Sequence, residues 1–423
     1  MCGIVGIVSK ESVNQQLYDA LTVLQHRGQD ASGMATSEND RLHLRKGNGL
    51  VRDVFLDQHM QSLVGNIGIG HCRYPTAGSS SSAEAQPMYV NSPYGITLAH
   101  NGNLTNAITL RNELVKEGAI FYTTSDTEVI VQLIAKSKRS KTIDKVIDAI
   151  FQIQGGYALV MLTQNTLVGV RDPFGIRPLV IGKLNDSYVF ASETCALDII
   201  GAKYVRDVEN GEIVSIQNNK LNSIKPFPAK KIRPCVFEYI YFSRPDSLLN
   251  GKCAYEYRKN FGAELAKENS LKGDLVVPVP DSGNAAAIGF SQLTKIPFDL
   301  GLIRNHYVGR TFIEPAQKIR SLGVKLKLNA NKTTIKNKII ILIDDSLVRG
   351  TTSHKIVKML YDAGAKEVHV RIACPEIKYP DFYGVDTPTK KELLAANMSN
   401  NPVSYTHLRA HETRGNLVCR LLL

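Results

Sequence analysis

The fold of the second half of the chain is decided by one stretch, Lys338-Ile339-Ile340-Ile341-Leu342-Ile343-Asp344-Asp345-Ser346-Leu347-Val348-Arg349-Gly350-Thr351-Thr352-Ser353. It opens with a continuous apolar run, which is typical of a parallel strand covered on both faces. A helical pattern from His354 to Ala363 follows and stops at Gly364, a favourable residue just past a helix end. Another apolar run, Val368 to Ala373, comes next. The stretch therefore predicts a βαβ unit in a parallel sheet.

Two adjacent carboxylates stand where the predicted strand ends. Open α/β sheets bind ligands at the carboxyl ends of their strands, so Asp344 and Asp345 indicate a ligand site. The loop from Arg349 to Ser353 then enters a helix, and backbone N–H groups at such a junction bind phosphate. Carboxylates beside a phosphate would repel the ligand unless they face sugar hydroxyls or a divalent cation. A phosphorylated ribose meets both conditions, whereas an acidic turn capping a helix would explain only Asp345 or Ser346.

The same stretch resembles the ribose-phosphate motif of type I phosphoribosyltransferases. The resemblance implies that Asp344 and Asp345 hold the ribose hydroxyls, with one Mg²⁺ ion per subunit bound beside them. It also implies that the residues after them cradle the 5-phosphate. The phosphoribosyl-binding residues expected here are Ser346, Arg349, Gly350, Thr351, Thr352 and Ser353.

An earlier apolar run, Asp274 to Pro280, predicts a neighbouring strand, and a helix is expected from Ala285 to Leu293. The loop between them contains Asp281, Ser282 and Gly283, which resemble the pyrophosphate loop of the same family. Relatives often carry a hydroxyl residue at the position of Gly283, so a third, side-chain contact to the metal is left open there.

A basic, glycine-containing segment lies between these two loops in the sequence, from Ile303 to Ile313. Its position between two phosphate-binding elements favours a mobile lid that closes over pyrophosphate. The alternative is an ordinary solvated, charged loop. The residues expected in the lid are Arg304, Asn305, Tyr307, Gly309 and Arg310.

At the other end of the chain, Cys2 directly follows Met1 in Met1-Cys2-Gly3-Ile4-Val5-Gly6-Ile7. Removal of Met1 would leave a thiol and a free α-amine on one residue, with ordinary pKa values of about 8.5 and about 8. An N-terminal nucleophile assisted by its own amine is a recognised route to covalent catalysis. The alternative is a buried cysteine that begins a β-strand.

A thiol that cleaves an amide needs further groups, and the sequence offers candidates. Asn101 and Gly102 could donate a side-chain and a backbone N–H to an oxyanion. Arg73 could bind the α-carboxylate of free glutamine and Asp126 its α-ammonium group. Each has a structural alternative, since Asn-Gly is a turn signal and Asp126 could cap a helix.

The first half reads as strands alternating with amphipathic helices. Short strands are expected around Ile67 to Gly70 and Ile96 to Ala99. Helices are expected from Ser12 to Leu24, after a serine cap, and from Ser125 to Ala135.

Five segments together resemble the class II glutamine amidotransferases: Cys2 to Gly6, His26 to Gly28, His71 to Thr76, His100 to Leu104 and Ser125 to Glu128. The resemblance implies that Arg27 and Gly28 belong to a loop that folds over glutamine. With the phosphoribosyl motif, the chain resembles the amidophosphoribosyltransferase family. The implied fold is α/β: an N-terminal-nucleophile αββα sandwich over residues 2–232, then a type I phosphoribosyltransferase domain with a mainly parallel sheet over residues 233–399.

The family resemblance implies a two-step reaction. Cys2 would hydrolyse glutamine through a thioester, and the ammonia would displace pyrophosphate from phosphoribosyl pyrophosphate to give 5-phosphoribosylamine, the first committed step of purine biosynthesis. Homo-oligomerisation and inhibition by purine nucleotides are family expectations. Two other functions stay open here: another glutamine-dependent enzyme such as a glucosamine-phosphate synthase, and a phosphoribosyl-binding regulator without catalysis.

Two features depart from the family pattern. Some relatives hold a [4Fe–4S] cluster, and Cys235 stands at a ligand position, but Asp381 stands where a second thiolate should be. We therefore expect no [4Fe–4S] cluster. Residues 400–423 resemble translated vector sequence, so we expect a non-native tail after a C-terminally truncated second domain; a divergent natural tail is the alternative.

Composition limits the remaining possibilities. A chain of 423 residues favours two domains. No run of about 18 apolar residues and no signal segment is found, so we expect a cytoplasmic protein without a membrane partner. The seven cysteines form no Cys-x-x-Cys pair, which disfavours a disulfide framework or a zinc site. The net charge of +12 suits anionic metabolites, and without tryptophan or an aromatic-plus-basic motif no nucleic-acid partner is expected.

Overall fold

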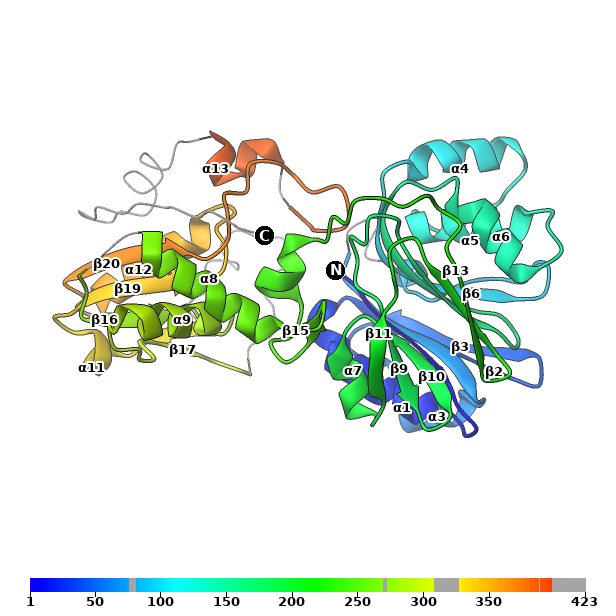
Figure 1. Ribbon diagram of the computed structural model, residues 1–423, viewed down its shortest axis with the longest axis horizontal. Coiled ribbons are helices and arrows are strands. Elements are labelled where there is room, and N and C mark those ends of the chain that lie inside the picture. The colour runs from blue at the N-terminus through cyan, green and yellow to red at the C-terminus, as the bar shows by residue number, and fades with distance from the viewer. Residues whose placement is uncertain (76–80, 269–271, 308–326, 388, 398–423) are drawn as a thin grey trace. The chain divides into compact units, whose positions relative to one another are not determined.

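The computed structural model describes residues 1–75, 81–268, 272–307, 327–387 and 389–397, and the chain divides into two units (Figure 1). The first unit comprises Met1–Glu238, Phe242–Asn250 and Asp381–Asp386. The second unit comprises Tyr239–Tyr241, Gly251–Pro380 and the chain from Thr387. A short segment that follows the last strand of the second unit in sequence therefore belongs to the first unit.

Two antiparallel sheets form the centre of the first unit. Within the described residues, one has the strand order β11-β9-β10-β1-β4-β2-β3 and the other β13-β12-β8-β7-β6-β5. The strands are β1 (Gly3–Val8), β2 (Ala31–Glu38), β3 (Arg41–Asn48), β4 (Ile67–Arg73), β5 (Met88–Val90), β6 (Ile96–Leu104), β7 (Gly155–Leu162), β8 (Leu167–Arg171), β9 (Val180–Leu184), β10 (Ser187–Ala191), β11 (Lys203–Asp207), β12 (Ile213–Gln217) and β13 (Lys220–Ile224).

Helices cover the outer face of each sheet (Figure 1). The helices and helical turns of this unit are α1 (Asn14–Val23), η1 (Leu24–Arg27), α2 (Val51–Val54), α3 (Asp57–Ser62), η2 (Ser82–Glu84), α4 (Ala107–Lys116), α5 (Asp126–Lys136), α6 (Thr142–Ile150) and α7 (Thr194–Ile199). Helices α1 and α7 pack on the sheet that contains β1, whereas α5 and α6 pack on the sheet that contains β6.

Strand β1 shows why two sheets stack face to face. Side chains of successive residues in a strand point to opposite faces, so Val5 and Ile7 join the core beneath α1, while Ile4 joins the core between the sheets. Gly6 also faces the second sheet, and a Cβ there would lie 2.5 Å from Cγ1 of Val160. The sheets approach closely because this position has no side chain. The αββα sandwich expected from the sequence is confirmed.

The two helices predicted in this half are both present, with one correction. Ser125 caps α5, because its Oγ accepts a hydrogen bond from the backbone N–H of Thr127 at 3.2 Å. The serine cap expected for α1 is wrong: Val13 occupies the cap position and makes no side-chain cap. The Oδ1 atom of Asn14 instead accepts from the N–H of Gln15 at 2.9 Å. This contact joins adjacent residues and is not a cap, so α1 begins without a side-chain cap.

The second unit contains the parallel sheet that the opening stretch predicts. Its strands are β16 (Leu275–Pro278), β19 (Ile339–Asp344) and β20 (Glu367–Ile372), paired in parallel in the order β16-β19-β20 among the described residues. Helix α9 (Asn284–Thr294) follows β16, and α12 (Thr351–Asp362) connects β19 to β20. Gly364, with φ of 95°, lies just past the end of α12, as expected. The parallel arrangement is confirmed.

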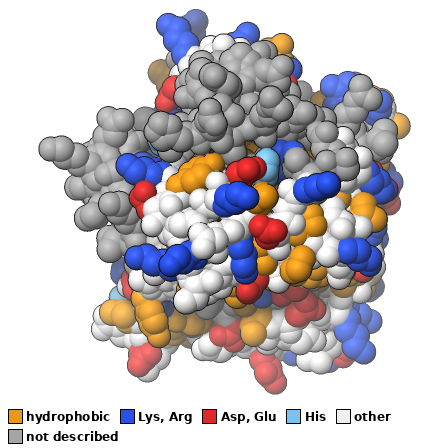
Figure 2. Space-filling model, turned by 90° about the vertical axis from the view of Figure 1, so that its left-hand side faces the viewer, with side chains coloured by type: hydrophobic (Ala, Val, Ile, Leu, Met, Phe, Trp, Pro, Cys, Tyr) orange, Lys and Arg blue, Asp and Glu red, His pale blue; other side chains and the backbone are white. Residues whose placement is uncertain are grey.

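The other elements are short, apart from one helix. They are η3 (Glu238–Phe242), β14 (Leu248–Leu249), β15 (Lys252–Cys253), α8 (Ala254–Glu268), β17 (Leu302–Arg304), β18 (Leu328–Ala330), α11 (Lys332–Ile335), η5 (Lys390–Glu392) and α13 (Leu394–Asn397). On the face in Figure 2, lysine and arginine side chains are set among acidic, apolar and uncharged ones. None of the helices in the described ranges has the length and apolar character needed to cross a membrane.

Candidate functional site

Cys2 lies at the start of β1, next to the end of β4, and is 6% exposed. The pairing of β1 with β4 sets Gly3 opposite Cys72, which brings the residues after Cys72 beside the thiol. The backbone N–H of Tyr74 donates to Cys2 Sγ at 3.4 Å. Met1 is also buried, and burial lowers the pKa of its α-amine to about 5. While Met1 is present, the backbone nitrogen of Cys2 is therefore shielded from solvent.

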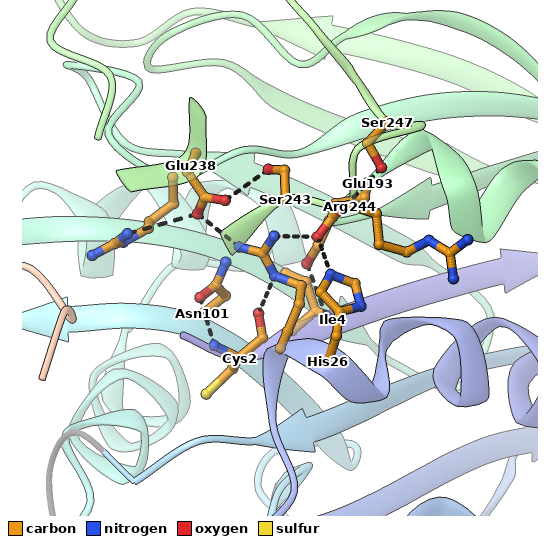
Figure 3. Close-up of polar contacts among 12 residues, drawn as sticks. Cys2, Ile4, His26, Asn101, Glu193, Glu238, Ser243, Arg244 and Ser247 are labelled. Atoms are coloured by element: carbon orange, nitrogen blue, oxygen red, sulfur yellow. Dashed lines mark hydrogen bonds and ion pairs between the residues drawn. The ribbon is translucent and has the colours of Figure 1, made fainter. Parts of the chain in front are cut away.

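Asn101 lies on β6 and faces Cys2 (Figure 3). Its Oδ1 atom accepts a hydrogen bond from the backbone N of Cys2 at 3.0 Å. Because a backbone N–H must meet an oxygen, this bond fixes which end of the amide is which. The Nδ2 atom is buried and has no hydrogen-bond partner among the described residues. A buried donor without a partner is costly in free energy, so the site supplies a donor ready for an incoming acceptor.

Gly102 continues β6 in a conformation that only glycine adopts readily. Its φ is 149°, and a Cβ there would lie 2.0 Å from the carbonyl oxygen of Gly156 on β7. The register of β6 against β7 sets Gly102 opposite Tyr157. Glycine is therefore required here on two independent grounds, the backbone angle and the close approach of the neighbouring strand.

Arg73 and Asp126, the two residues predicted to bind glutamine, are both largely buried. Arg73 ends β4, and its Nη1 atom pairs with Oδ2 of Asp30 at 2.6 Å. Asp126 begins α5, and its Oδ2 atom accepts from the backbone N–H of Leu104, at the end of β6, at 2.9 Å. Asp126 is therefore fastened to the strand that carries Asn101. Binding of glutamine by Arg73 and Asp126 stays a prediction.

The side chain of Arg27 is buried against the backbone of Cys2 and does not reach the surface. Its side chain is fully buried, and Nε donates to the carbonyl oxygen of Cys2 at 3.0 Å. Its two other nitrogens pair with Glu193 at 2.5 Å and Glu238 at 2.7 Å. Figure 3 labels both of these glutamates. The next residue, Gly28, has no room for a side chain, because a Cβ would lie 2.5 Å from the carbonyl oxygen of Arg73. The expected contact of Arg27 and Gly28 with glutamine stays a prediction.

Glu193, which was not predicted from the sequence, anchors this buried network. Its carboxylate accepts from Arg27, from His26 Nε2 at 2.7 Å, from the backbone N of Arg244 at 2.8 Å and from Ser247 Oγ at 2.7 Å. Burial opposes ionisation, but His26 and Arg27 hold the pKa of Glu193 well below its usual value. No local pattern around Glu193 signals this role, because these partners come from two distant segments, one at His26 and Arg27 and the other at Arg244 and Ser247.

Two buried histidines flank the site. Nε2 of His71 donates to the carbonyl oxygen of His100 at 3.2 Å, and Nδ1 of His100 lies 3.1 Å from Thr127 Oγ1. Burial lowers the pKa of His71 to about 3 and also lowers that of His100. Both imidazoles are therefore uncharged at neutral pH, as expected of core histidines.

The acidic pair of the second unit lies at the carboxyl end of β19. Asp344 and Asp345 are both largely buried, and Asp344 Oδ1 accepts from the backbone N–H of Asp345 at 2.9 Å. Burial and the adjacent Asp345 raise the pKa of Asp344 well above its usual range. A bound cation would stabilise the ionised form of both carboxylates.

The two predicted ligand loops lie at the same edge of the parallel sheet. Ser282 Oγ, in the loop after β16, donates to Asp345 Oδ1 at 2.7 Å. Gly283 is required by close packing, since a Cβ would lie 2.5 Å from the carbonyl oxygen of Ile343. Ser346 Oγ donates to the other oxygen of Asp345 at 2.7 Å. The structure thus brings Ser282, Asp345 and Ser346 together.

The predicted phosphate cradle forms the start of α12. Gly350 takes the cap position with φ of 75°, and Thr351, Thr352 and Ser353 form the first turn. Arg349 is half exposed and pairs with Glu392 at 3.2 Å. A backbone that enters a helix in this way directs N–H groups towards one point, which suits a phosphate. Phosphate binding itself stays a prediction.

Only part of the predicted lid lies within the described residues. Arg304 ends β17 and forms an ion pair with Asp281, which ties this segment to the loop after β16. The backbone N–H of Asn305 donates to the carbonyl oxygen of Lys327 at 2.8 Å, and Tyr307 is fully exposed. Gly309 and Arg310 lie outside the described residues.

The carboxylates at β19 fit the Mg²⁺ ion that the sequence implies. Among the described residues no group of three or more histidine, cysteine, aspartate or glutamate side chains could hold a metal. Mg²⁺ commonly uses only one or two protein carboxylates, and substrate phosphates and water supply the remaining ligands. Asp344 and Asp345 match that requirement, so an ion there would depend on bound substrate.

Comparisons with known proteins agree across the chain. A glutamine amidotransferase domain model matches residues 71–198. The amidophosphoribosyltransferase of Rhizobium etli is 50% identical over 93% of this chain and 81% of its own length. That of Methanocaldococcus jannaschii is 44% identical over 95% of this chain and 90% of its own length. A solved glutamine phosphoribosylpyrophosphate amidotransferase from B. subtilis, complexed with ADP and GMP, matches with a TM-score of 0.90 and 43% identity over 96% of this chain and 88% of that one.

Proposed function

The chain belongs to the amidophosphoribosyltransferase family, and we propose that its first unit releases ammonia from glutamine while its second transfers that ammonia to phosphoribosyl pyrophosphate. The products are glutamate, pyrophosphate and 5-phosphoribosylamine. This reaction is the glutamine-dependent first step of purine biosynthesis. The domain boundary predicted near residues 232 and 233 is part of the same proposal.

One observation supports the glutaminase step above all others. Asn101 accepts from the backbone N of Cys2 through Oδ1, and its Nδ2 atom is buried without a partner among the described residues. A carbonyl attacked by Cys2 Sγ would place its developing negative charge within reach of the residue that holds the nucleophile. An oriented donor in a water-poor site stabilises such a charge strongly.

The first step follows from this arrangement. Cys2 Sγ attacks the carbon of the glutamine side-chain amide, and Asn101 Nδ2 with the N–H of Gly102 stabilises the oxyanion. The proton of the Cys2 thiol passes by way of the α-amine of Cys2 to the amide nitrogen, which leaves as ammonia. The carbon–nitrogen bond is thereby replaced by a thioester between Cys2 and the glutamyl group. Water then cleaves the thioester and releases glutamate. Arg73 and Asp126 would bind the α-carboxylate and α-ammonium groups, and Arg27 and Gly28 would shape the loop beside them.

The second step belongs to the edge of the parallel sheet. Ammonia forms a bond to ribose C1 as the bond from C1 to pyrophosphate breaks. Asp344 and Asp345 would orient the ribose hydroxyls, and the cradle from Arg349 to Ser353 would bind the 5-phosphate. Mg²⁺, when bound, neutralises charge on the leaving pyrophosphate. Asp281, Ser282 and Gly283 would contact pyrophosphate, with the lid segment of Arg304, Asn305 and Tyr307 beside them.

Other properties of the chain extend this proposal. We propose a cytoplasmic homo-oligomer that purine nucleotides inhibit; the nucleotide complexes of a solved relative support the last point. We also propose that the chain holds no [4Fe–4S] cluster. In support, the Asp381 carboxylate near Cys235 accepts from the backbone N–H groups of Tyr383 and Val385 at 2.8 and 2.9 Å.

The glucosamine-phosphate synthase alternative is not favoured, because the relatives that match over most of the chain are amidophosphoribosyltransferases. One assay separates the three functions: glutamate release from glutamine with and without phosphoribosyl pyrophosphate. Strong stimulation is expected. Glutamate release that ignores phosphoribosyl pyrophosphate would favour the synthase, and no release at all would favour a regulator without catalysis.

A further inference from the structure

The segment Asp381–Asp386 is packed against the strand that carries the oxyanion donors, although it follows the last strand of the second unit in sequence. Asn103, the residue after Gly102 on β6, donates from Nδ2 to the carbonyl oxygen of Phe382 at 2.9 Å. The segment is internally fixed, because Asp381 accepts from two backbone N–H groups within it. This short segment, which is held by its own hydrogen bonds, therefore contacts β6 at Asn103, the residue after Gly102.

Gly384 makes the closest approach in this segment. Its φ is 110°, and a Cβ there would lie 3.0 Å from the carbonyl carbon and 3.2 Å from the Cα of Gly102. The same Cβ would lie 3.1 Å from Nη2 of Arg177. Any side chain at 384 would therefore press on the backbone of Gly102. The position of this segment limits where the Gly102 backbone can lie.

Arg177 holds the segment in that position. Its side chain is fully buried, and its Nε atom donates to the carbonyl oxygen of Tyr383 at 3.0 Å, with a further bond from Nη2 to the same oxygen. A buried guanidinium with two donors on one carbonyl is a rigid clamp. The backbone of Arg177 is fixed in turn, since its N–H donates to Asp172 Oδ2 at 3.1 Å.

Arg177 and Arg27 lie on the same carboxylate, that of Glu238, although only Arg27 forms a hydrogen bond with it. Glu238 Oε1 lies 3.8 Å from Nη1 of Arg177 and accepts from Nη2 of Arg27 at 2.7 Å. Arg27 in turn donates to the carbonyl oxygen of Cys2. Figure 3 shows Glu238, Asn101 and Cys2 within this network. One carboxylate thus links the arginine that bonds the Cys2 carbonyl to the arginine that bonds the Tyr383 carbonyl.

We propose that Arg177 is a positioning residue for the glutaminase step: by clamping Asp381–Asp386 against β6, it sets the position of the Gly102 backbone relative to Cys2. This inference rests on the proposed function. Arg177 would touch neither substrate, and loss of the clamp would let the Gly102 N–H drift from the developing oxyanion. Misplacement of a donor by a fraction of an ångström weakens stabilisation of the transition state more than binding of the substrate.

The test compares glutamine-dependent and ammonia-dependent synthesis in purified full-length variants. In Arg177→Met, kcat with glutamine should fall by about tenfold to a hundredfold, while KM for glutamine and the rate with ammonia stay within about twofold of the wild-type values. Arg177→Lys, which keeps one donor for Tyr383, should recover part of the loss. Circular dichroism and thermal unfolding establish that each variant is folded.

Gly384→Ala provides the second route, in case Arg177→Met fails to fold. It should lower the same kcat, because its methyl group presses on Gly102. Gly201→Ala is the matched control: Gly201 also has a positive φ, of 73°, but a Cβ there would meet nothing within 4 Å. This control should keep both activities near wild type.

The outcomes separate the two claims. If the wild-type protein makes no 5-phosphoribosylamine from glutamine, the proposed function is wrong. If the wild type is active, two results would overturn the positioning role. One is an unchanged glutamine-dependent kcat in folded Arg177→Met and Gly384→Ala proteins. The other is an equal loss of glutamine-dependent and ammonia-dependent rates.

Discussion

The backbone N of Cys2 lies 3.0 Å from Oδ1 of Asn101, a residue 99 positions away in the sequence. The bond orients both groups at once: it directs the amide oxygen towards the nucleophile's nitrogen and leaves the amide nitrogen free to act as a donor. After Met1 is removed, the nitrogen of Cys2 would be an amine that keeps the same neighbour. Nucleophile and oxyanion donor are therefore held by a single contact.

Asn101→Asp separates the two roles of this residue. Aspartate keeps an oxygen for the nitrogen of Cys2 but has no Nδ2 donor. We expect kcat for glutamine-dependent synthesis to fall by about 10²- to 10³-fold, the usual cost of removing one oxyanion donor, with a small change in KM. Steady-state kinetics with glutamine and with ammonia measure this, and the ammonia-dependent rate should persist.

Asn106→Asp is the matched control, because Asn106 follows the same strand but uses Nδ2 to donate to the carbonyl oxygen of Gln152. Its kinetics should match the wild type. An Asn101→Asp protein with an undiminished kcat for glutamine would remove Asn101 from the oxyanion site.

Cys2→Ala tests the division of labour between the units. It should lower glutamine-dependent synthesis on the order of 10⁴-fold or more, since no other group can form the thioester. Ammonia-dependent synthesis should survive, because Asp344 and Asp345 lie in a separate unit. Cys72→Ala, at a buried cysteine on β4, is the control and should keep both activities.

Intact mass supplies a second measurement for the same residue. Met1 is buried next to Cys2, and its α-amine has a lowered pKa of about 5. The active protein should lack this residue, so that the amine belongs to Cys2. Full glutaminase activity in material that retains Met1 would contradict an N-terminal nucleophile.

Local sequence patterns predicted the elements that carry the site, and long-range packing supplied the rest. The apolar run before Asp344 and the helix after Ser125 were found because periodicity and caps are local properties. Glu193 and Arg177 were missed, since each is defined by partners far away in sequence. A local signal for Arg177 is present in the run Arg171-Asp172-Pro173-Phe174-Gly175-Ile176-Arg177, in which proline and glycine indicate a turn just before the arginine.

The family resemblance also left out how the predicted residues are held. The resemblance assigned Arg27 to the loop over glutamine. The burial of the Arg27 guanidinium against the Cys2 backbone, however, depends on Glu193 and Glu238, which come from other segments of the chain. The association of Asp381–Asp386 with the first unit likewise depends on tertiary packing, since no boundary signal marks that segment. Residue patterns along the sequence can therefore identify the residues of a site, but not the distant side chains that hold those residues in place.

Asp344→Asn tests the acidic pair of the second unit. Loss of one charged acceptor should raise KM for phosphoribosyl pyrophosphate by about tenfold to a hundredfold and lower the glutamine-dependent and ammonia-dependent rates alike. EDTA should abolish both, and added Mg²⁺ should restore them.

Asp362→Asn, at the exposed end of α12, is the control for charge removal in the same unit and should leave KM unchanged. A selective loss of the glutamine-dependent rate in Asp344→Asn would count against a role in the transferase step.

His71 should make the folded protein sensitive to acid. Its pKa is about 3 in the folded protein, against about 6.5 in an unfolded chain, because burial disfavours the charged imidazolium. Between those values the unfolded state binds the extra proton, so stability falls as the pH decreases, by up to about 1.4 kcal/mol per pH unit for one proton.

His71→Gln keeps a donor for the carbonyl oxygen of His100 but does not titrate. The thermal midpoint of this variant should therefore fall less between pH 6.5 and 4.5 than that of the wild type, with the remaining slope due partly to His100. His43→Gln, on the edge strand β3, should keep the wild-type slope, and an equally steep fall in His71→Gln would show that another group is responsible.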